Sequence, residues 1–255
     1  MLDAVLSGDA KKLAELIRRQ DPDFNVNKDR SGDGRTLLHY PCGKNRSAVI
    51  PILLAHPDID VNVKDRSGDT PFYVACVYGF TSCVGEMLKD SRVKVNEPDT
   101  NGFTPLFWAA GGGRVDIIKW WIVSGREMDL GKPGDVYKTD AIGAARERGR
   151  TEVVTLLERF KKNPEKTRSK VRLEIGWYDD LAAEMFALVV FVSAGLLQIN
   201  DTTTPSPAAR FLNIARRLPL ELQMVLCHRQ VGSAKEIIPR KESEVAFKEL
   251  ARRLE

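Results

Sequence analysis

The feature that most constrains this chain is a pattern that recurs along its first two thirds. Thr36, Thr70 and Thr104 lie 34 residues apart, and Asp140 takes the same place 36 residues further on. A fixed period of this length indicates supersecondary units that stack, because one such unit cannot bury its apolar face alone. The spacing therefore predicts a solenoid that grows in one direction.

Each unit contains the same parts in the same order. A charged turn, such as DRSGD at 65–69, precedes a threonine, and in two units a proline follows. Threonine can accept a hydrogen bond from a helix amide that lacks a partner, and proline has no amide to satisfy. A segment of small residues, a glycine and a second helix with an apolar stripe come next. The units therefore predict an all-α fold of paired helices.

The helix starts of three units carry a resemblance to a known family. They read TLLHYPCGKNR from Thr36, TPFYVACVYGF from Thr70 and TPLFWAAGGGR from Thr104. This pattern resembles the ankyrin repeat, a unit of about 33 residues with the signature T-P-L-H-x-A. The resemblance covers residues 1–162 as an N-terminal cap and about four repeats. It implies helix-turn-helix repeats with short β-turn fingers.

The departures from the family pattern are informative. Leu37 stands where the first unit should have proline, and Pro41 lies inside its first helix, so this unit is expected to be distorted. His39 keeps the family histidine, whereas Tyr73 and Phe107 replace it in the next two units. The fourth unit, TDAIGAARERG, lacks the proline and carries charges, which suits a repeat near the end of a stack.

The rest of the chain has a different period. Residues 163–176 are polar and basic and read as a linker or a short charged helix, and 177–255 read as a helical C-terminal domain. Its longest apolar segment, 185–199, is shorter than the roughly 20 residues that cross a bilayer, which favours a buried helix and no membrane. The run LPLELQMVLC resembles a segment of ankyrin proteins from fungi and protists, a likeness that implies no activity.

Residue patterns that support chemistry are missing from this sequence. The three histidines are far apart, the four cysteines form no CxxC pair, and no Ser/His/Asp set stands out. The glycines at 111–113 lack the frame of a phosphate-binding loop, and DRSGD has too few carboxylates for an EF-hand, so it reads as a charged turn. We therefore expect no enzyme activity, no cofactor and no metal site.

The formal charge of +4 is small for 255 residues and is not clustered in one part of the chain. This argues against a nucleic-acid partner, which requires a basic patch. The ankyrin resemblance implies a protein partner on the concave face, the side formed by the turn tips and the first helices. Carried over position by position, it implies these contact residues: Arg66, Ser67, Asp69, Val77, Tyr78, Thr100, Asn101, Phe103, Gly111 and Gly112.

Two aromatic residues stand out in this set. Neither Tyr78 nor Phe103 is needed by the repeat, and aromatic side chains often dominate binding hot spots. The alternative is that both pack on neighbouring turns. If Phe103 is a contact, Phe103→Ala should weaken partner binding and leave the melting temperature unchanged.

The sequence favours a non-catalytic protein–protein interaction module or scaffold that is monomeric. The unpaired cysteines and the lack of a secretory signal place it in the cytoplasm or the nucleus. One alternative is a substrate adaptor of a ubiquitin ligase, because the segment Leu218 to Leu222 with Val225 and Leu226 resembles the opening of an F-box. Another is an enzyme with its catalytic groups in the tail, which no constellation of residues supports.

Overall fold

A computed structural model describes residues 1–19, 25–28, 32–131 and 139–193, with isolated positions between 211 and 246. The regular elements in these ranges are helices, and no strand occurs among them. The chain divides into two compact units, residues 1–171 and 172–255. The all-α solenoid expected from the repeat period is thus confirmed for the first unit.

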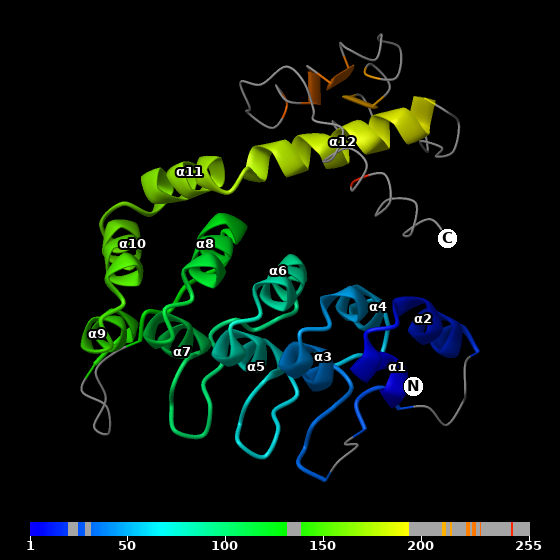
Figure 1. Ribbon diagram of the computed structural model, residues 1–255. Helices are drawn as coiled ribbons and strands as arrows, with labels where there is room; N and C mark the ends of the chain where they lie inside the picture. The colour runs from blue at the N-terminus through cyan, green and yellow to red at the C-terminus, as the bar shows by residue number, and fades with distance from the viewer. Residues whose placement is uncertain are drawn as a thin grey trace. The chain divides into compact units, whose positions relative to one another are not determined.

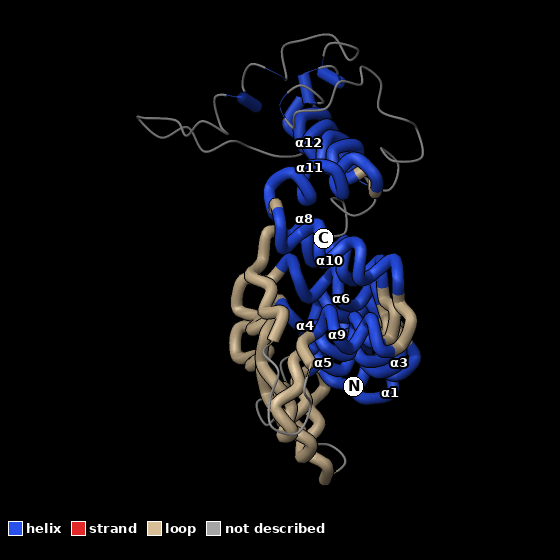
Figure 2. Tube along the Cα trace, turned by 90° about the vertical axis from the view of Figure 1, so that its left-hand side faces the viewer, coloured by secondary structure: helices blue, strands red, loops and turns tan. Residues whose placement is uncertain are grey.

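Two rows of helices form the first unit, and the loops between repeats project from one side as fingers (Figures 1 and 2). Successive helices of each row pack on one another. The inner row consists of α1 (Leu2–Ser7), α3 (His39–Lys44), α5 (Pro71–Tyr78), α7 (Pro105–Gly111) and α9 (Ala141–Glu147). The outer row consists of α2 (Ala10–Arg18), the 3₁₀ helix η1 (Ser47–Val49) with α4 (Ile50–Leu54), α6 (Thr81–Lys89), α8 (Val115–Ser124) and α10 (Thr151–Lys162).

Three inner helices begin as the repeat pattern predicts. The hydroxyls of Thr70 and Thr104 accept hydrogen bonds of 3.2 and 3.3 Å from the amides three residues later. The carboxylate of Asp140 accepts a 2.7 Å bond from the amide of Gly143. Each bond satisfies a helix amide that has no intrahelical acceptor. These side chains therefore fix where α5, α7 and α9 start.

The first full repeat is distorted, as its sequence predicts. Helix α3 begins three residues after Thr36, whereas α5 begins directly after Thr70. The amide of Thr36 donates instead to Nδ1 of His39, at 3.1 Å. The outer part of this repeat is split into η1 and α4, with a proline in the first turn of α4.

An asparagine side chain joins each repeat to the next on the side of the outer helices. Its amide nitrogen donates to a carbonyl of the following repeat, and its oxygen accepts from an amide two residues further along. We call these the asparagine clamps. The donor and acceptor contacts are Asn27 with Asp58 and Asp60 (2.7 and 2.9 Å), Asn62 with Arg92 and Lys94 (2.9 and 2.8 Å), and Asn96 with Glu127 and Asp129 (3.4 and 3.1 Å).

The core of the first unit lies between the two rows. Trp121 is fully buried and meets the ring of Phe72 edge-on, with 5.2 Å between the ring centroids. Its indole nitrogen donates a 3.1 Å hydrogen bond to the carbonyl of Glu127, so burial leaves no polar atom of this side chain unsatisfied. The core of the third repeat is thus built around a bulky aromatic side chain.

Helix α11 (Pro164–Glu174) occupies most of the segment that the sequence left open as a linker or a short helix. The hydroxyl of Thr167 donates to the carbonyl of Arg159 at 3.0 Å, and Nε of Arg168 donates to the carbonyl of Ile122 at 3.0 Å. These bonds tie the start of α11 to the last helices of the array.

The second unit contains α12 (Trp177–Ser193), which packs several small and apolar side chains into a cluster with Ala215, Cys227 and Ala246. Leu226 is half-buried and packs against this cluster. The other residues of the F-box-like segment, 218–222 and Val225, lie outside the described residues. Within the described ranges, no helix is both long enough and apolar enough to cross a membrane.

Candidate partner-binding site

The fingers are built around an aspartate that binds its own turn. Oδ1 of Asp65 accepts hydrogen bonds from the amides of Ser67 (2.9 Å) and Asp69 (3.1 Å). Asp99 does the same one repeat later with the amides of Asn101 and Phe103, both at 2.9 Å. Aspartate favours such turns because its short side chain reaches backbone amides two residues on. The DRSGD segment is therefore a charged turn, as expected.

Neighbouring fingers touch through their backbones. The amide of Arg66 donates to the carbonyl of Asp33 at 2.9 Å, and the amide of Thr100 donates to the carbonyl of Ser67 at 3.2 Å. Gly68 permits this approach, because a Cβ there would come within 2.7 Å of the Thr100 nitrogen. Its φ of +79° is also unfavourable for other residues. The second finger, residues 65–69, and the third finger, residues 99–103, are thus held side by side.

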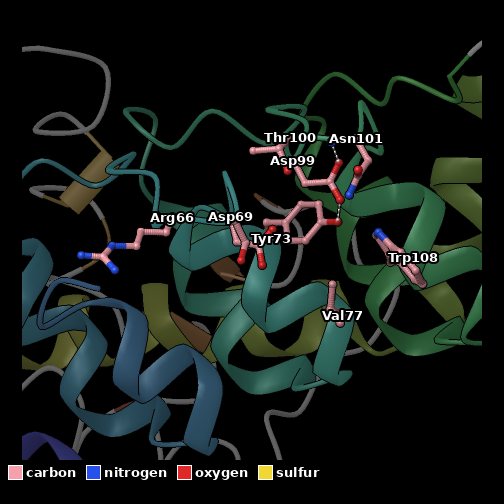
Figure 3. A pocket seen from close by; sticks show the side chains of 9 residues that line it. Arg66, Asp69, Tyr73, Val77, Asp99, Thr100, Asn101 and Trp108 are labelled. Carbon is pink, nitrogen blue, oxygen red and sulfur yellow. Dashed lines mark hydrogen bonds between the residues drawn. The ribbon is translucent and has the colours of Figure 1, made fainter. Parts of the chain in front are cut away.

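A pocket of about 460 Å³ lies where these two fingers meet α5 and α7 (Figure 3). Six of the ten residues that the family resemblance implied as partner contacts line it, and three further residues complete it. The six are Arg66, Ser67, Asp69, Val77, Thr100 and Asn101, and the three are Tyr73, Asp99 and Trp108.

Tyr73, from α5, is hydrogen-bonded across the pocket to the third finger. Its hydroxyl donates a 2.8 Å hydrogen bond to Oδ2 of Asp99, drawn as a dashed line in Figure 3. Burial is the larger cause that raises the pKa of Tyr73, and the hydrogen bond to a carboxylate is the second. The phenol therefore stays protonated. The indole N–H of Trp108 lies near the hydroxyl and has a smaller, opposite effect on that pKa.

Asp69 is a half-buried carboxylate that forms no ion pair and no side-chain hydrogen bond with the residues the structure describes. Burial, together with the negative charges of Asp65 and Asp99, raises the pKa of Asp69 to about 6, and the charge of Arg35 opposes this. Nε of Arg35 is instead 3.2 Å from the Asp65 carboxylate. The pocket thus contains a negative charge that its described neighbours do not neutralise.

The indole N–H of Trp108 is a weakly satisfied donor. Its Nε1 is buried and lies near the Tyr73 hydroxyl, but it forms no hydrogen bond of normal geometry within the described part of the chain. In Figure 3 this nitrogen is turned towards Tyr73 and Asn101. The guanidinium of Arg148 lies 5.5 Å from the centroid of the Trp108 ring and covers one face of it.

The remaining four implied contact residues lie outside the pocket lining. Gly111 is buried, and a Cβ on it would come within 2.7 Å of Nη1 of Arg148, so the arginine covers this glycine. Gly112 is half-buried. The glycine pair is therefore required by packing and leaves no open patch at Gly111.

Tyr78 and Phe103 differ sharply in exposure. Tyr78 is 54% exposed and stacks on Phe80, with 5.8 Å between the centroids. Phe103 is only 8% exposed and packs on Phe107, with the centroids 4.6 Å apart. Tyr78 is thus available to a partner, whereas Phe103 is a packing residue. We revise the expectation that Phe103→Ala would leave the melting temperature unchanged.

The described residues show no arrangement suited to catalysis by metal or thiolate. They contain no group of three His, Cys, Asp or Glu residues that could hold a metal ion. All four cysteines are buried and unpaired. Burial raises the pKa of Cys83 to about 11 and that of Cys227 to about 12, so both remain neutral thiols near pH 7.

Comparison with known proteins places the front of the chain in a family. The family model described as ankyrin repeats, in three copies, matches residues 1–99 and 53–131. Human SMC5-SMC6 complex localization factor protein 1 is 32% identical over 132 residues, which is 47% of this chain. Mouse Rabankyrin-5 is 29% identical over 113 residues, or 42% of the chain. The chain spans only 12% and 10% of the length of these two relatives.

Proposed function

Since this chain belongs to the ankyrin-repeat proteins, we propose that it is a non-catalytic interaction module that binds a protein partner on its concave face. The observation that carries the proposal is the pocket between the second and third fingers. It brings together six residues that the family pattern implies as partner contacts, from two different repeats. A protein that spans both fingers would engage all of them at once.

The chemistry of this face suits a protein partner. The pocket combines carboxylates, hydroxyl and amide side chains and an indole N–H. Tyr78, which follows the lining residue Val77 in α5, has an exposed ring. Interfaces typically use a few aromatic anchors surrounded by polar groups. Tyr78 has the exposure that such an anchor requires.

The relatives support the same class of role. One of them is named as a localization factor for a protein complex. A comparable function for this chain, as a scaffold that brings one protein to another, follows from the proposal. We also propose that the protein acts in the cytoplasm or the nucleus, and that it is a monomer.

The proposal can be tested by site-specific photo-crosslinking in the cells that express the protein. A benzophenone side chain would replace Tyr78 or Asn101 on the concave face, or Asp116 on outer helix α8 as the matched control. We expect one protein to be captured from both concave positions and not from position 116. Mass spectrometry would then identify it.

A second arm would test whether capture depends on the site. Tyr78→Ala in the Asn101 crosslinker background should reduce capture of the same protein while the circular dichroism melting curve stays unchanged. Equal capture from position 116, or no dependence on Tyr78, would refute binding through the concave face.

A further inference from the structure

We infer that the pocket between the second and third fingers receives a basic side chain, lysine or arginine, from the partner protein. The inference rests on the proposed function, because it takes the occupant to be part of a protein chain. It goes further by naming the chemistry that the pocket recognises.

The main requirement comes from the carboxylates. Asp69 is half-buried without an ion pair or a side-chain hydrogen bond among the described residues, and Asp99 lines the same pocket. It costs free energy to keep a carboxylate partly desolvated without a hydrogen-bond donor. A cationic donor neutralises the charge and supplies the hydrogen bond. The pocket is thus electrostatically suited to an ammonium or guanidinium group.

The cations near the pocket that the structure describes do not fill this role. Nε of Arg35 is 3.2 Å from Asp65 and 3.5 Å from Asp33. Arg66 lines the rim, but its guanidinium points away from Tyr73 and Asp99 in Figure 3. Arg148 lies over the ring of Trp108. None of the described cations therefore occupies the place beside Asp69, which leaves it to a cation of the partner.

Trp108 reports on the occupancy of the pocket. Its Nε1 is buried beside the Tyr73 hydroxyl and forms no hydrogen bond of normal geometry with the described residues. A side chain that packs on Tyr73 next to Asp69 would alter the surroundings of this N–H. The indole signal of Trp108 is therefore a probe of binding.

The aromatic wall adds to the selection. The ring of Tyr73 lies between Asp69 and Trp108 in Figure 3 and gives the aliphatic stem of a long side chain a surface to contact. Because Arg148 already covers one face of Trp108, we assign the charge recognition to the carboxylates and not to that face of the indole.

The test uses the 255-residue chain labelled with ¹⁵N, whose four tryptophans give four indole N–H signals. Trp108→Phe identifies the signal of Trp108. The probes are the Nα-acetyl N-methylamides of lysine, arginine, norleucine and Nε-acetyl-lysine. We expect the lysine or arginine probe to shift the Trp108 signal in a saturable way, and the two uncharged probes to leave it in place.

Two variants locate the effect. Asp69→Asn should weaken binding of the basic probe by about tenfold, since it removes a charge-assisted contact. Asp116→Asn removes the same charge from exposed α8 and should leave the affinity unchanged. Equal shifts from norleucine, or an unchanged affinity in Asp69→Asn that remains folded by its melting curve, would overturn the inference. Those results could coexist with Tyr78-dependent crosslinking, so failure here is distinct from failure of the proposed function.

Discussion

The hydroxyl of Tyr73 binds the carboxylate of Asp99 at 2.8 Å, and this contact connects an inner helix to the finger of the following repeat. One repeat earlier, Nε2 of His39 lies 3.1 Å from the carbonyl of Asp69 and makes the equivalent connection. The longer side chain of Tyr73 reaches the side chain of Asp99, whereas His39 reaches the backbone of Asp69. The substitution of tyrosine for histidine therefore keeps the link between repeats and changes the acceptor.

We expect Tyr73→Phe to lower the free energy of unfolding by about 1 kcal/mol, because it removes one hydrogen bond to a carboxylate. Urea denaturation followed by circular dichroism would measure the loss. Tyr78→Phe is the matched control: it deletes the same atom from an exposed ring and should change stability by less than about 0.5 kcal/mol. Equal effects of the two changes would contradict a specific role for the Tyr73–Asp99 bond.

Asp69→Asn should stabilise the protein at pH 7. The pKa of Asp69 is raised to about 6 in the folded state, so the folded protein binds this proton more tightly than the unfolded chain does. Ionisation of Asp69 therefore removes stability as the pH rises from about 4 towards 6. Because the carboxylate is partly solvated, we expect a gain of only about 1 kcal/mol from the substitution at pH 7.

The gain from Asp69→Asn should shrink as the pH falls from 6 to 4, since Asp69 is then increasingly protonated in the folded protein. Thermal melts of wild type and variant across this range would measure it. Asp116→Asn serves as the control for a general charge effect. A stabilisation that grew on acidification would contradict the assigned direction of the pKa shift.

Phe103→Ala should reduce the free energy of unfolding by about 3 kcal/mol, because it empties a buried aromatic site beside Phe107. Tyr78→Ala should leave stability nearly unchanged and weaken binding of the crosslinked partner by at least about 2 kcal/mol. Urea denaturation and titration calorimetry would separate the two effects. A stable Phe103→Ala protein would show that this side chain is not part of the packing.

Asn62→Ala should cost about 1 to 2 kcal/mol, since it removes both hydrogen bonds of one asparagine clamp at a partly exposed site. Asn101→Ala is a suitable control, because the bond recorded at Asn101 comes from its backbone amide. Its free energy of unfolding should stay within about 0.5 kcal/mol of wild type. Similar losses in both variants would argue that the clamp contributes little.

Much of the array could be predicted from the sequence because its helix starts are encoded locally. Thr70, Thr104 and Asp140 cap their helices within three residues, and such contacts follow from spacing alone. The distortion of the first repeat was predicted for the same reason, since Pro41 restricts its own turn. The family pattern also selected six of the nine pocket residues.

The other three pocket residues depend on contacts between repeats. Tyr73 and Trp108 lie on inner helices, and the neighbouring finger sets the direction of their side chains. Asp99 binds its own turn through Oδ1, and only the folded array brings its Oδ2 to Tyr73 of the preceding repeat. One feature of the sequence does indicate the role of Tyr73: a longer polar side chain replaces the family histidine there and can reach the next finger. The sequence leaves Phe103 open between partner contact and packing, because its burial depends on Phe107 and on Ala144 one repeat later.

The asparagine clamps bear on how the protein would respond to force. The three clamps link successive repeats in the same way, so each shares the load at its joint with the packing of the helices. The bond from Asn96 to the carbonyl of Glu127 is the longest of their donor contacts, at 3.4 Å against 2.7 and 2.9 Å in the others. The clamp at Asn96 is therefore the weakest of the three hydrogen-bonded joints, and we expect it to be the first of the three to break when the array is pulled along its length.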